Sequence, residues 1–308
     1  MEEPQLILRW VMFHFGGGDA LLVGLLFLLA ISWAESKFWK NRNGRWTLVT
    51  IVAVFWGLLA SPAWPIWTAV PFLVLLVSWR VVLSRTQRTL RQTRVAEWAV
   101  RIACVGLLGY EWLVTWPAGR PGPFEQLCVI GDSVTAGLND GERTWPRLCS
   151  EMSGLTVRDA SQQGATCRLA LGQAQALEDD SSPLILEIGG NDLLSGLPVA
   201  EFEQDLEKLC KRVCQPGRTV WMCELPLPPL CSRYGIAQRR LSQQYGMRLI
   251  SKRRFMAVLC SSGGTVDGVH LSEQGQQRMC DLMLTVTGSP TTAARAGRYI
   301  RCARTGRR

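Results

Sequence analysis

The sequence predicts a helical, membrane-embedded region followed by an α/β domain, a three-layer α/β/α sandwich around a parallel sheet. Residues 20–34 and 46–79 contain no charged side chain, whereas strand-like and helical stretches alternate from residue 124 to residue 287. Tryptophan divides in the same way, because 11 of the 13 tryptophans lie in residues 1–116. We therefore expect a transmembrane region at 1–116, a linker at 117–123 and the α/β domain at 124–287.

The apolar runs predict an all-α transmembrane region of three to four helices. A spanning helix needs about 20 mostly apolar residues. Residues 46–79 are too long for one ordinary span, and Pro62 and Pro65 divide them into two short ones. A further candidate, residues 98–116, is less apolar because it carries Arg101 and Glu111.

Basic residues predict the orientation of these helices. One group follows the first apolar run and a second group follows the third: Lys37, Lys40, Arg42 and Arg45, then Arg80, Arg85, Arg88, Arg91 and Arg94. The positive-inside rule assigns both groups to the cytoplasm. The α/β domain then lies outside the cytoplasm if residues 98–116 span, and inside if they lie flat as an amphipathic helix. We favour spanning, because Arg101 and Glu111 can sit near opposite ends.

The net charge of +9 does not describe the α/β domain. Residues 1–123 carry a net +6, residues 124–288 a net −3, and residues 289–308 carry six arginines and no acid. A nucleic-acid-binding domain needs a basic face, so we expect no specific nucleic-acid partner and expect membrane lipids instead. Residues 288–308 read as a disordered basic tail. The 11 cysteines include no C-x-x-C pair, so a zinc site is not expected, and disulfides and buried thiols both stay open.

The α/β domain is predicted element by element. The strands are Leu127–Ile130, Leu155–Arg158, Leu184–Ile188, Val220–Glu224 and Arg248–Ile250, and the helices are Thr144–Met152, Cys167–Glu178, Val199–Val213, Ile236–Tyr245 and Glu273–Leu284. This alternation predicts a parallel sheet with helices on both faces. In such sheets the functional site lies outside the carboxyl ends of the strands.

A candidate nucleophile stands at the first of these strand ends. Ser133 follows the strand in the run Gly131-Asp132-Ser133, and a serine hydroxyl needs a neighbouring base to become nucleophilic. The chain has two histidines, and His14 lies among apolar residues, so the base is expected to be His270. Asp267 precedes it by three residues and can orient the imidazole.

Four separated blocks carry a family resemblance. They are Gly131-Asp132-Ser133, then Gly164, then Gly189-Gly190-Asn191-Asp192, and Asp267-Gly268-Val269-His270. In this order they resemble the SGNH/GDSL hydrolase superfamily of serine esterases and lipases, over roughly residues 124–287. The resemblance implies a flavodoxin-like, five-stranded sheet and no cofactor or metal. It also implies three oxyanion donors: the backbone N–H groups of Ser133 and Gly164, and the side-chain amide of Asn191.

These features together predict a membrane-anchored, multi-pass serine hydrolase whose catalytic domain is extracytoplasmic. It is expected to cleave oxygen esters of glycans, envelope components or lipids through a Ser133 acyl-enzyme. An O-acyltransferase with the same Ser-His-Asp site is the first alternative. A catalytically inactive, membrane-anchored binding module is the second, and the intact site residues argue against it. The acyl group, the alcohol and the oligomeric state stay open.

Overall fold

The computed structural model describes residues 3–37, 45–85, 89–115, 124–139 and 141–289 of the chain. They fall into two compact units. The helical unit comprises residues 1–116 together with Leu227–Ile236, and the α/β unit comprises Pro117–Pro226 and the residues from Ala237 onward. The expected linker at 117–123 lies outside the described residues, and so does the expected basic tail at 288–308 apart from residues 288 and 289.

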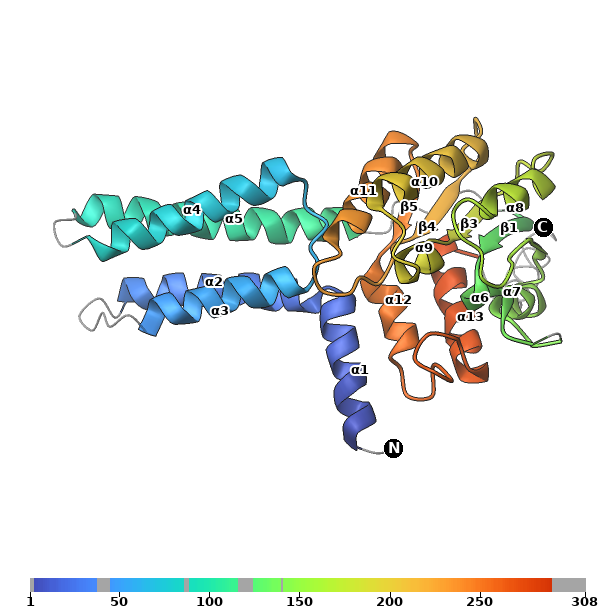
Figure 1. Cartoon of the computed structure of the whole chain (residues 1–308), viewed down its shortest axis with the longest axis horizontal. Coiled ribbons are helices and arrows are strands. Elements are labelled where there is room, and N and C mark those ends of the chain that lie inside the picture. Colours follow the sequence, from blue (N-terminus) through green and yellow to red (C-terminus); the bar gives the residue numbers. More distant parts are fainter. Residues whose placement is uncertain (1–2, 38–44, 86–88, 116–123, 140, 290–308) are drawn as a thin grey trace, which may run out of the picture. The chain divides into compact units, whose positions relative to one another are not determined.

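The helical unit contains five helices among the described residues. They are α1 (Glu3–Gly16), α2 (Asp19–Lys37), α3 (Arg45–Leu59), α4 (Ile66–Ser84) and α5 (Leu90–Thr115). Helices α2 to α5 run alongside one another, whereas α1 is set at an angle to α2 (Figure 1). Helix α1 was not predicted from the sequence, and its apolar residues are interrupted by polar and charged ones. The break between α3 and α4 falls at the expected prolines.

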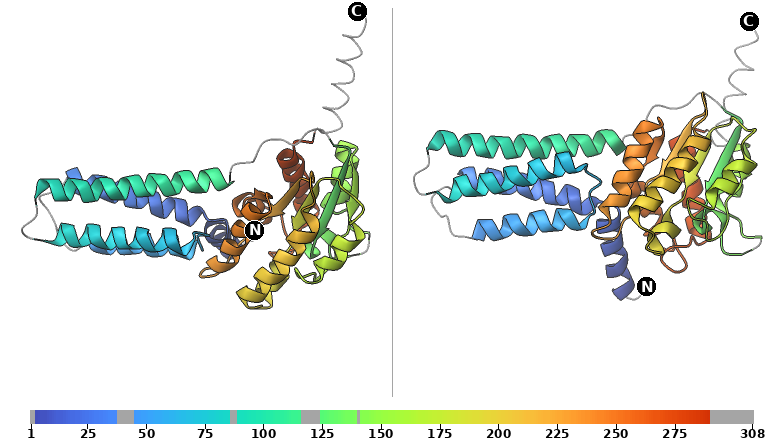
Figure 2. Two further views of the ribbon diagram at one scale, coloured as in Figure 1. Left: turned by 90° about the horizontal axis from the view of Figure 1, so that it is seen from above. Right: turned by 45° about the horizontal axis from the view of Figure 1, so that its top comes forward.

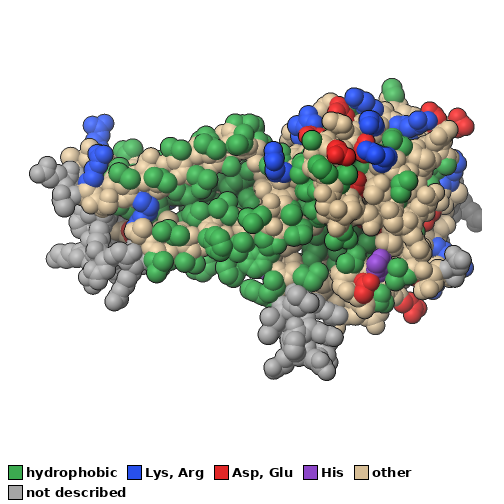
Figure 3. Space-filling model, viewed as in Figure 1, with side chains coloured by type: hydrophobic (Ala, Val, Ile, Leu, Met, Phe, Trp, Pro, Cys, Tyr) green, Lys and Arg blue, Asp and Glu red, His purple; other side chains and the backbone are tan. Residues whose placement is uncertain are grey.

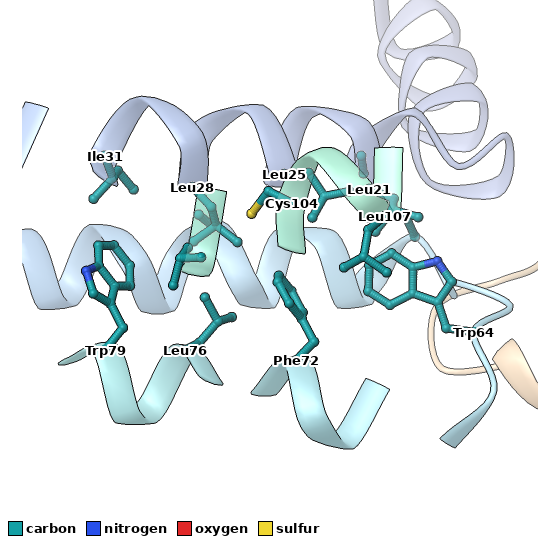
Figure 4. Close-up of a cluster of buried hydrophobic side chains, with 14 of the residues drawn as sticks. Leu21, Leu25, Leu28, Ile31, Trp64, Phe72, Leu76, Trp79, Cys104 and Leu107 are labelled. Atoms are coloured by element: carbon teal, nitrogen blue, oxygen red, sulfur yellow. The ribbon is translucent and has the colours of Figure 1, made fainter. Parts of the chain in front are cut away.

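Apolar side chains from the helices form the core of this unit. Leu25 and Leu28 of α2, Phe72 and Leu76 of α4, and Cys104 of α5 all belong to this buried cluster, which Figure 4 draws in close-up. Helices α2 and α3 approach closely at a glycine. A Cβ atom at Gly24 would lie 3.0 Å from a carbonyl oxygen of α3 and 3.2 Å from the Cα atom of a glycine there.

Only some helices of this unit are long and apolar enough to cross a membrane. Among the described residues, Ile66–Ser84 is the one single helix that is long and apolar enough to cross a bilayer. Trp10–Gly16 and Asp19–Glu35 pass together as a pair bent by 73°, and Thr47–Leu59 is apolar but shorter. The structure thus supports one or two candidate spans, and the expected number of three to four is not confirmed.

A five-stranded parallel sheet forms the centre of the α/β unit. Its strands are β1 (Gln126–Gly131), β2 (Thr156–Asp159), β3 (Leu184–Glu187), β4 (Val220–Cys223) and β5 (Arg248–Ile250). They are arranged in the order β2-β1-β3-β4-β5, and every neighbouring pair is parallel. This is the flavodoxin-like order. The predicted parallel sheet is therefore confirmed, and all five expected strands are present within one residue or two at each end.

Helices cover this sheet, as two further views make clear (Figure 2). Their bounds are α6 (Ser133–Ala136), α7 (Trp145–Ser153), α8 (Ala170–Ala176), α9 (Gly190–Leu194), α10 (Val199–Val213), α11 (Ser232–Gln244), α12 (Lys252–Leu259) and α13 (Glu273–Thr287). Helix α13 packs on α7 and α12, and α8 packs on α10, so these helices fall into two groups. Helices α6, α9 and α12 were not predicted from the sequence; each spans eight residues or fewer.

Candidate active site

The turn after β1 presents Ser133 at the carboxyl edge of the sheet. Ser133 is the first residue of α6, and the Asp132 carboxylate caps this turn by accepting a 2.9 Å hydrogen bond from the Val134 N–H. Glycine at position 131 lets the chain turn directly from β1 into α6, because a Cβ there would lie only 2.6 Å from the Thr135 side chain. The hydroxyl-bearing residue is therefore fixed by a strand on one side and a capped turn on the other.

The structure brings Ser133, His270 and Asp267 into one hydrogen-bonded chain. Ser133 Oγ lies 3.0 Å from His270 Nε2, and His270 Nδ1 lies 2.6 Å from Asp267 Oδ2. The hydrogen bond with His270 lowers the pKa of Asp267 to about 2. Asp267 is thus ionised at neutral pH and fixes the imidazole with Nδ1 as the donor. Nε2 is then free to accept the Ser133 proton.

The segment that carries His270 is held in place by its own backbone. Asp267 Oδ1 accepts hydrogen bonds from the N–H groups of Val269 (2.9 Å) and His270 (2.8 Å). An antiparallel bridge joins Thr265 to Leu271. Immediately afterwards, the hydroxyl of Ser272 caps α13 by accepting a hydrogen bond from Gly275 N–H. The expected dual use of this segment, to carry the histidine and to enter a helix, agrees with this geometry.

Gly164 lies on the loop after β2, and Asn191 lies in the first turn of α9, shortly after β3. Gly164 is exposed, with φ of +70°, and a Cβ at this position would meet no heavy atom within 4 Å. Asn191 Nδ2 donates to Ala165 O at 3.0 Å and makes a longer, 3.4 Å contact with Asp132 Oδ2. The amide of Asn191 therefore ties together the loops of the first three sequence blocks.

Asp192 fixes the loop that carries Gly164 through a buried hydrogen bond. Its side chain is fully buried, and its carboxylate accepts a 2.9 Å hydrogen bond from Cys167 N–H. Gln162 N–H donates to Gly131 O at 3.1 Å, which joins the same loop to β1. Asp132 and Asp192 thus bond nearby loop amides, the structural role that the sequence suggests for both.

Two buried polar residues behind the site, Gln173 and Glu187, were not predicted from the sequence to support it. Gln173 of α8 holds both polar groups of Gly131, accepting from its N–H at 3.0 Å and donating to its carbonyl at 3.0 Å. Glu187, the last residue of β3, is 2% exposed and accepts a 2.9 Å hydrogen bond from Thr135 Oγ1. A polar residue on the buried face of a helix or at the end of an apolar strand is the signal that identifies them.

A flavodoxin-like sheet with a serine, a histidine and an aspartate gathered at its carboxyl edge is the architecture of a serine ester hydrolase. Residues 129–278 match the family model of the GDSL-like lipase/acylhydrolases. The C-terminal half of this chain is thus a hydrolase domain of the GDSL/SGNH esterase family.

Known proteins resemble the same part of the chain. Esterase TesA of Pseudomonas aeruginosa is 28% identical over 173 residues, which are 51% of this chain and 85% of that protein. Thioesterase 1/protease 1/lysophospholipase L1 of Escherichia coli is 25% identical over 174 residues, 53% of this chain and 84% of that protein. An arylesterase of Vibrio mimicus is 31% identical over 113 residues, 34% of this chain and 56% of that protein.

Solved structures match over a similar extent. A crystal structure of TesA has a TM-score of 0.45 and 25% identity, and covers 52% of this chain and 97% of its own. The esterase EstA from Pseudoalteromonas sp. has a TM-score of 0.46 and 22% identity, and covers 53% of this chain and 96% of its own.

Proposed function

We propose that this protein is a membrane-anchored serine hydrolase that cleaves esters of aliphatic acyl groups through a Ser133 acyl-enzyme. The observation that carries the proposal is the hydrogen-bonded chain from Ser133 through His270 to Asp267. Each member has the partner that its step requires. The esterase family of the domain supports the same reaction class.

The reaction proceeds in two halves. His270 Nε2 takes the Ser133 proton as Oγ attacks the ester carbonyl, and the ionised Asp267 stabilises the imidazolium that forms. Negative charge develops on the carbonyl oxygen, where the N–H groups of Ser133 and Gly164 and the Asn191 amide donate hydrogen bonds. His270 then gives its proton to the departing alcohol, leaving an acyl group on Ser133. Water attacks this acyl-enzyme with His270 again as the base, which releases the acid.

Exposed apolar side chains favour esters of longer aliphatic acids over acetyl esters of glycans as the substrate. In the described part of the α/β unit, the exposed large apolar residues are Leu138, Leu169, Leu194, Val266 and Val269. Each of them lies within five positions along the chain of Ser133, Gly164, Asn191 or His270. Since scattered apolar exposure needs no explanation but clustering does, we assign this apolar rim to contact with the acyl chain.

The surface of the helical unit supports anchoring in a membrane. Hydrophobic side chains cover much of α2 to α5 on the face seen in Figure 3, and the exposed ones include Trp67, Val74 and Val77 of α4. A water-soluble surface rarely carries so continuous an apolar area. Two polar pairs inside the unit join its helices: Arg80 with Glu35 at 2.8 Å, and Trp64 Nε1 with Glu111 at 2.7 Å.

Helix α5 supports an extracytoplasmic hydrolase domain. It has 26 residues, which at 1.5 Å per residue give about 39 Å, so its length, though not its composition, meets the requirement for crossing a bilayer. Arg101, the charge nearest its middle, donates hydrogen bonds to the carbonyl and hydroxyl oxygens of Ser32 at 2.8 and 3.0 Å. A paired arginine of this kind is compatible with a membrane-crossing helix. A reporter fused after Arg308 tests the side, and a cytoplasmic signal would contradict it.

Labelling with a fluorophosphonate probe tests the catalytic proposal directly. Wild-type protein should be labelled at Ser133 and should hydrolyse a medium-chain p-nitrophenyl ester. The variants Ser133→Ala and His270→Ala should lose both properties, while Ser182→Ala, which alters a serine away from this edge, should keep them. Hydrolysis that survives Ser133→Ala would exclude this mechanism.

A further inference from the structure

Two carboxyl side chains lie buried directly behind the candidate nucleophile. The parallel register pairs Glu187 of β3 with Gly131 of β1, one residue before Asp132. Glu187 is 2% exposed and Asp132 is 3% exposed. The two side chains hydrogen-bond to each other. Two ionised carboxylates in direct contact would repel each other and neither could donate a hydrogen bond. A hydrogen bond between them therefore requires one proton on the pair.

The surroundings assign this proton to Glu187. Burial raises the pKa of Glu187 well above its ordinary value, and the charge of Asp132 raises it further. Burial also raises the pKa of Asp132, to about 6, against the hydrogen bond from Val134 N–H, which lowers it. At neutral pH Glu187 is therefore the donor and Asp132 the ionised acceptor. Thr135 Oγ1 donates to the other side of Glu187 and itself accepts from Trp145 Nε1 at 3.3 Å.

Other ionisable groups face the pair from neighbouring segments. Asp192 of α9 raises the pKa of Asp132, and a protonated His270 lowers it. Burial raises the pKa of the Cys223 thiol of β4, and the charges of Glu187 and Asp132 raise it further. None of these groups replaces the proton between the two carboxyls.

The Asp132 carboxylate contacts both parts of the proposed catalytic machinery. Its Oδ1 accepts from Val134 N–H at 2.9 Å, in the turn whose first residue is Ser133. Its Oδ2 lies 3.4 Å from Asn191 Nδ2. Glycine at 190 permits this approach, since a Cβ there would lie 3.3 Å from the same Oδ2. Any movement of this carboxylate would shift the nucleophile and the oxyanion donor together.

We propose that Glu187 is a positioning residue, whose proton holds the Asp132 carboxylate against both the Ser133 turn and Asn191. The inference rests on the proposed function, because it concerns the same reaction. Both groups keep their protons to higher pH in the folded than in the unfolded protein, so the free energy of unfolding falls as pH rises through the folded-state pKa values. The contacts of Asp132 with the Ser133 turn and with Asn191 are what assign the pair a positioning role.

Two substitutions of Glu187 separate its role as a hydrogen-bond donor to Asp132 from its role in filling space. Glu187→Gln keeps a donor for Asp132 and an acceptor for Thr135, so kcat should stay within about threefold of wild type. Glu187→Leu removes the donor at similar volume, and kcat should fall about 100-fold with little change in KM. Labelling of Ser133 by the fluorophosphonate probe should slow in parallel, since it needs the same geometry. A carboxylic-acid C=O band in the infrared spectrum at pH 7 should disappear in Glu187→Gln.

Each outcome decides the question. Wild-type kcat in folded Glu187→Leu, or an equal loss in Glu187→Gln, would overturn the positioning role. If Glu187→Leu does not fold, the infrared comparison decides, because an unchanged carboxylic-acid band in Glu187→Gln would show that Glu187 carries no proton. Activity that survives Ser133→Ala would refute the proposed function itself, whereas an inactive Ser133→Ala with an active Glu187→Leu refutes only this inference.

Discussion

Replacing Asn191 by alanine should separate transition-state stabilisation from structural support. Asn191 Nδ2 makes one good hydrogen bond, to Ala165 O at 3.0 Å, and one long contact, to Asp132 at 3.4 Å. The ground-state loss should thus be about one hydrogen bond, about 1 kcal/mol, or about 2–4 °C in Tm. Loss of an oxyanion donor costs far more in the transition state, about 100- to 1,000-fold in kcat.

Steady-state hydrolysis of a p-nitrophenyl ester, together with a thermal melt, measures both quantities. The expected pattern is a kcat lowered by at least about 100-fold, a nearly unchanged KM and a small loss of stability. Asn139→Ala is the matched control, because Asn139 is an exposed asparagine in the loop after α6. If the kcat of Asn191→Ala fell no more than that of the control, Asn191 would not be an oxyanion donor.

Three further substitutions probe the triad, the support of β1 and the apolar rim. Asp267→Asn should lower kcat about 10⁴-fold by favouring the wrong tautomer of His270. Because the pKa of Asp267 is lowered to about 2 from 3.8, its contribution to stability is complete above about pH 4 and is lost as pH falls through 2. Unfolding of Asp267→Asn should therefore depend less on pH in this window, and identical profiles would contradict this. Gln173→Leu removes both buried hydrogen bonds to Gly131 and should cost about 2–4 kcal/mol in urea unfolding; a loss below about 1 kcal/mol would show that Gly131 finds other partners. Leu194→Ser should reduce kcat/KM about three- to tenfold for octanoyl but not acetyl esters, and an equal effect on both would remove the rim from substrate recognition.

The sheet and the grouping of Ser133, His270 and Asp267 could be predicted because their signals are local in the sequence. Most of the strands are short apolar runs bounded by turn residues, and each of the first three blocks follows a strand. The order β2-β1-β3-β4-β5 then brings the first three blocks together at one edge without further information. His270 could be chosen because His14 was the sole competitor.

The supporting residues could not be predicted, because their roles arise from contacts between distant segments. Glu187 reads as the polar end of an apolar strand until β3 is placed beside β1. Gln173 reads as one of several polar residues on a short helix, and its double hydrogen bond to Gly131 spans 42 positions. The helix at Lys252–Leu259 could not be predicted because it has only eight residues and the first three of them are basic.

The triad also has a consequence for the order of folding. Asp267 and His270 are three positions apart and can pair as soon as their own loop forms, whereas Ser133 and His270 are separated by 137 positions. Contacts this distant form only after the intervening chain has paid its loop-closure entropy. The recovery of esterase activity during refolding should accordingly report assembly of the whole sheet, and should lag behind signals from local helix formation.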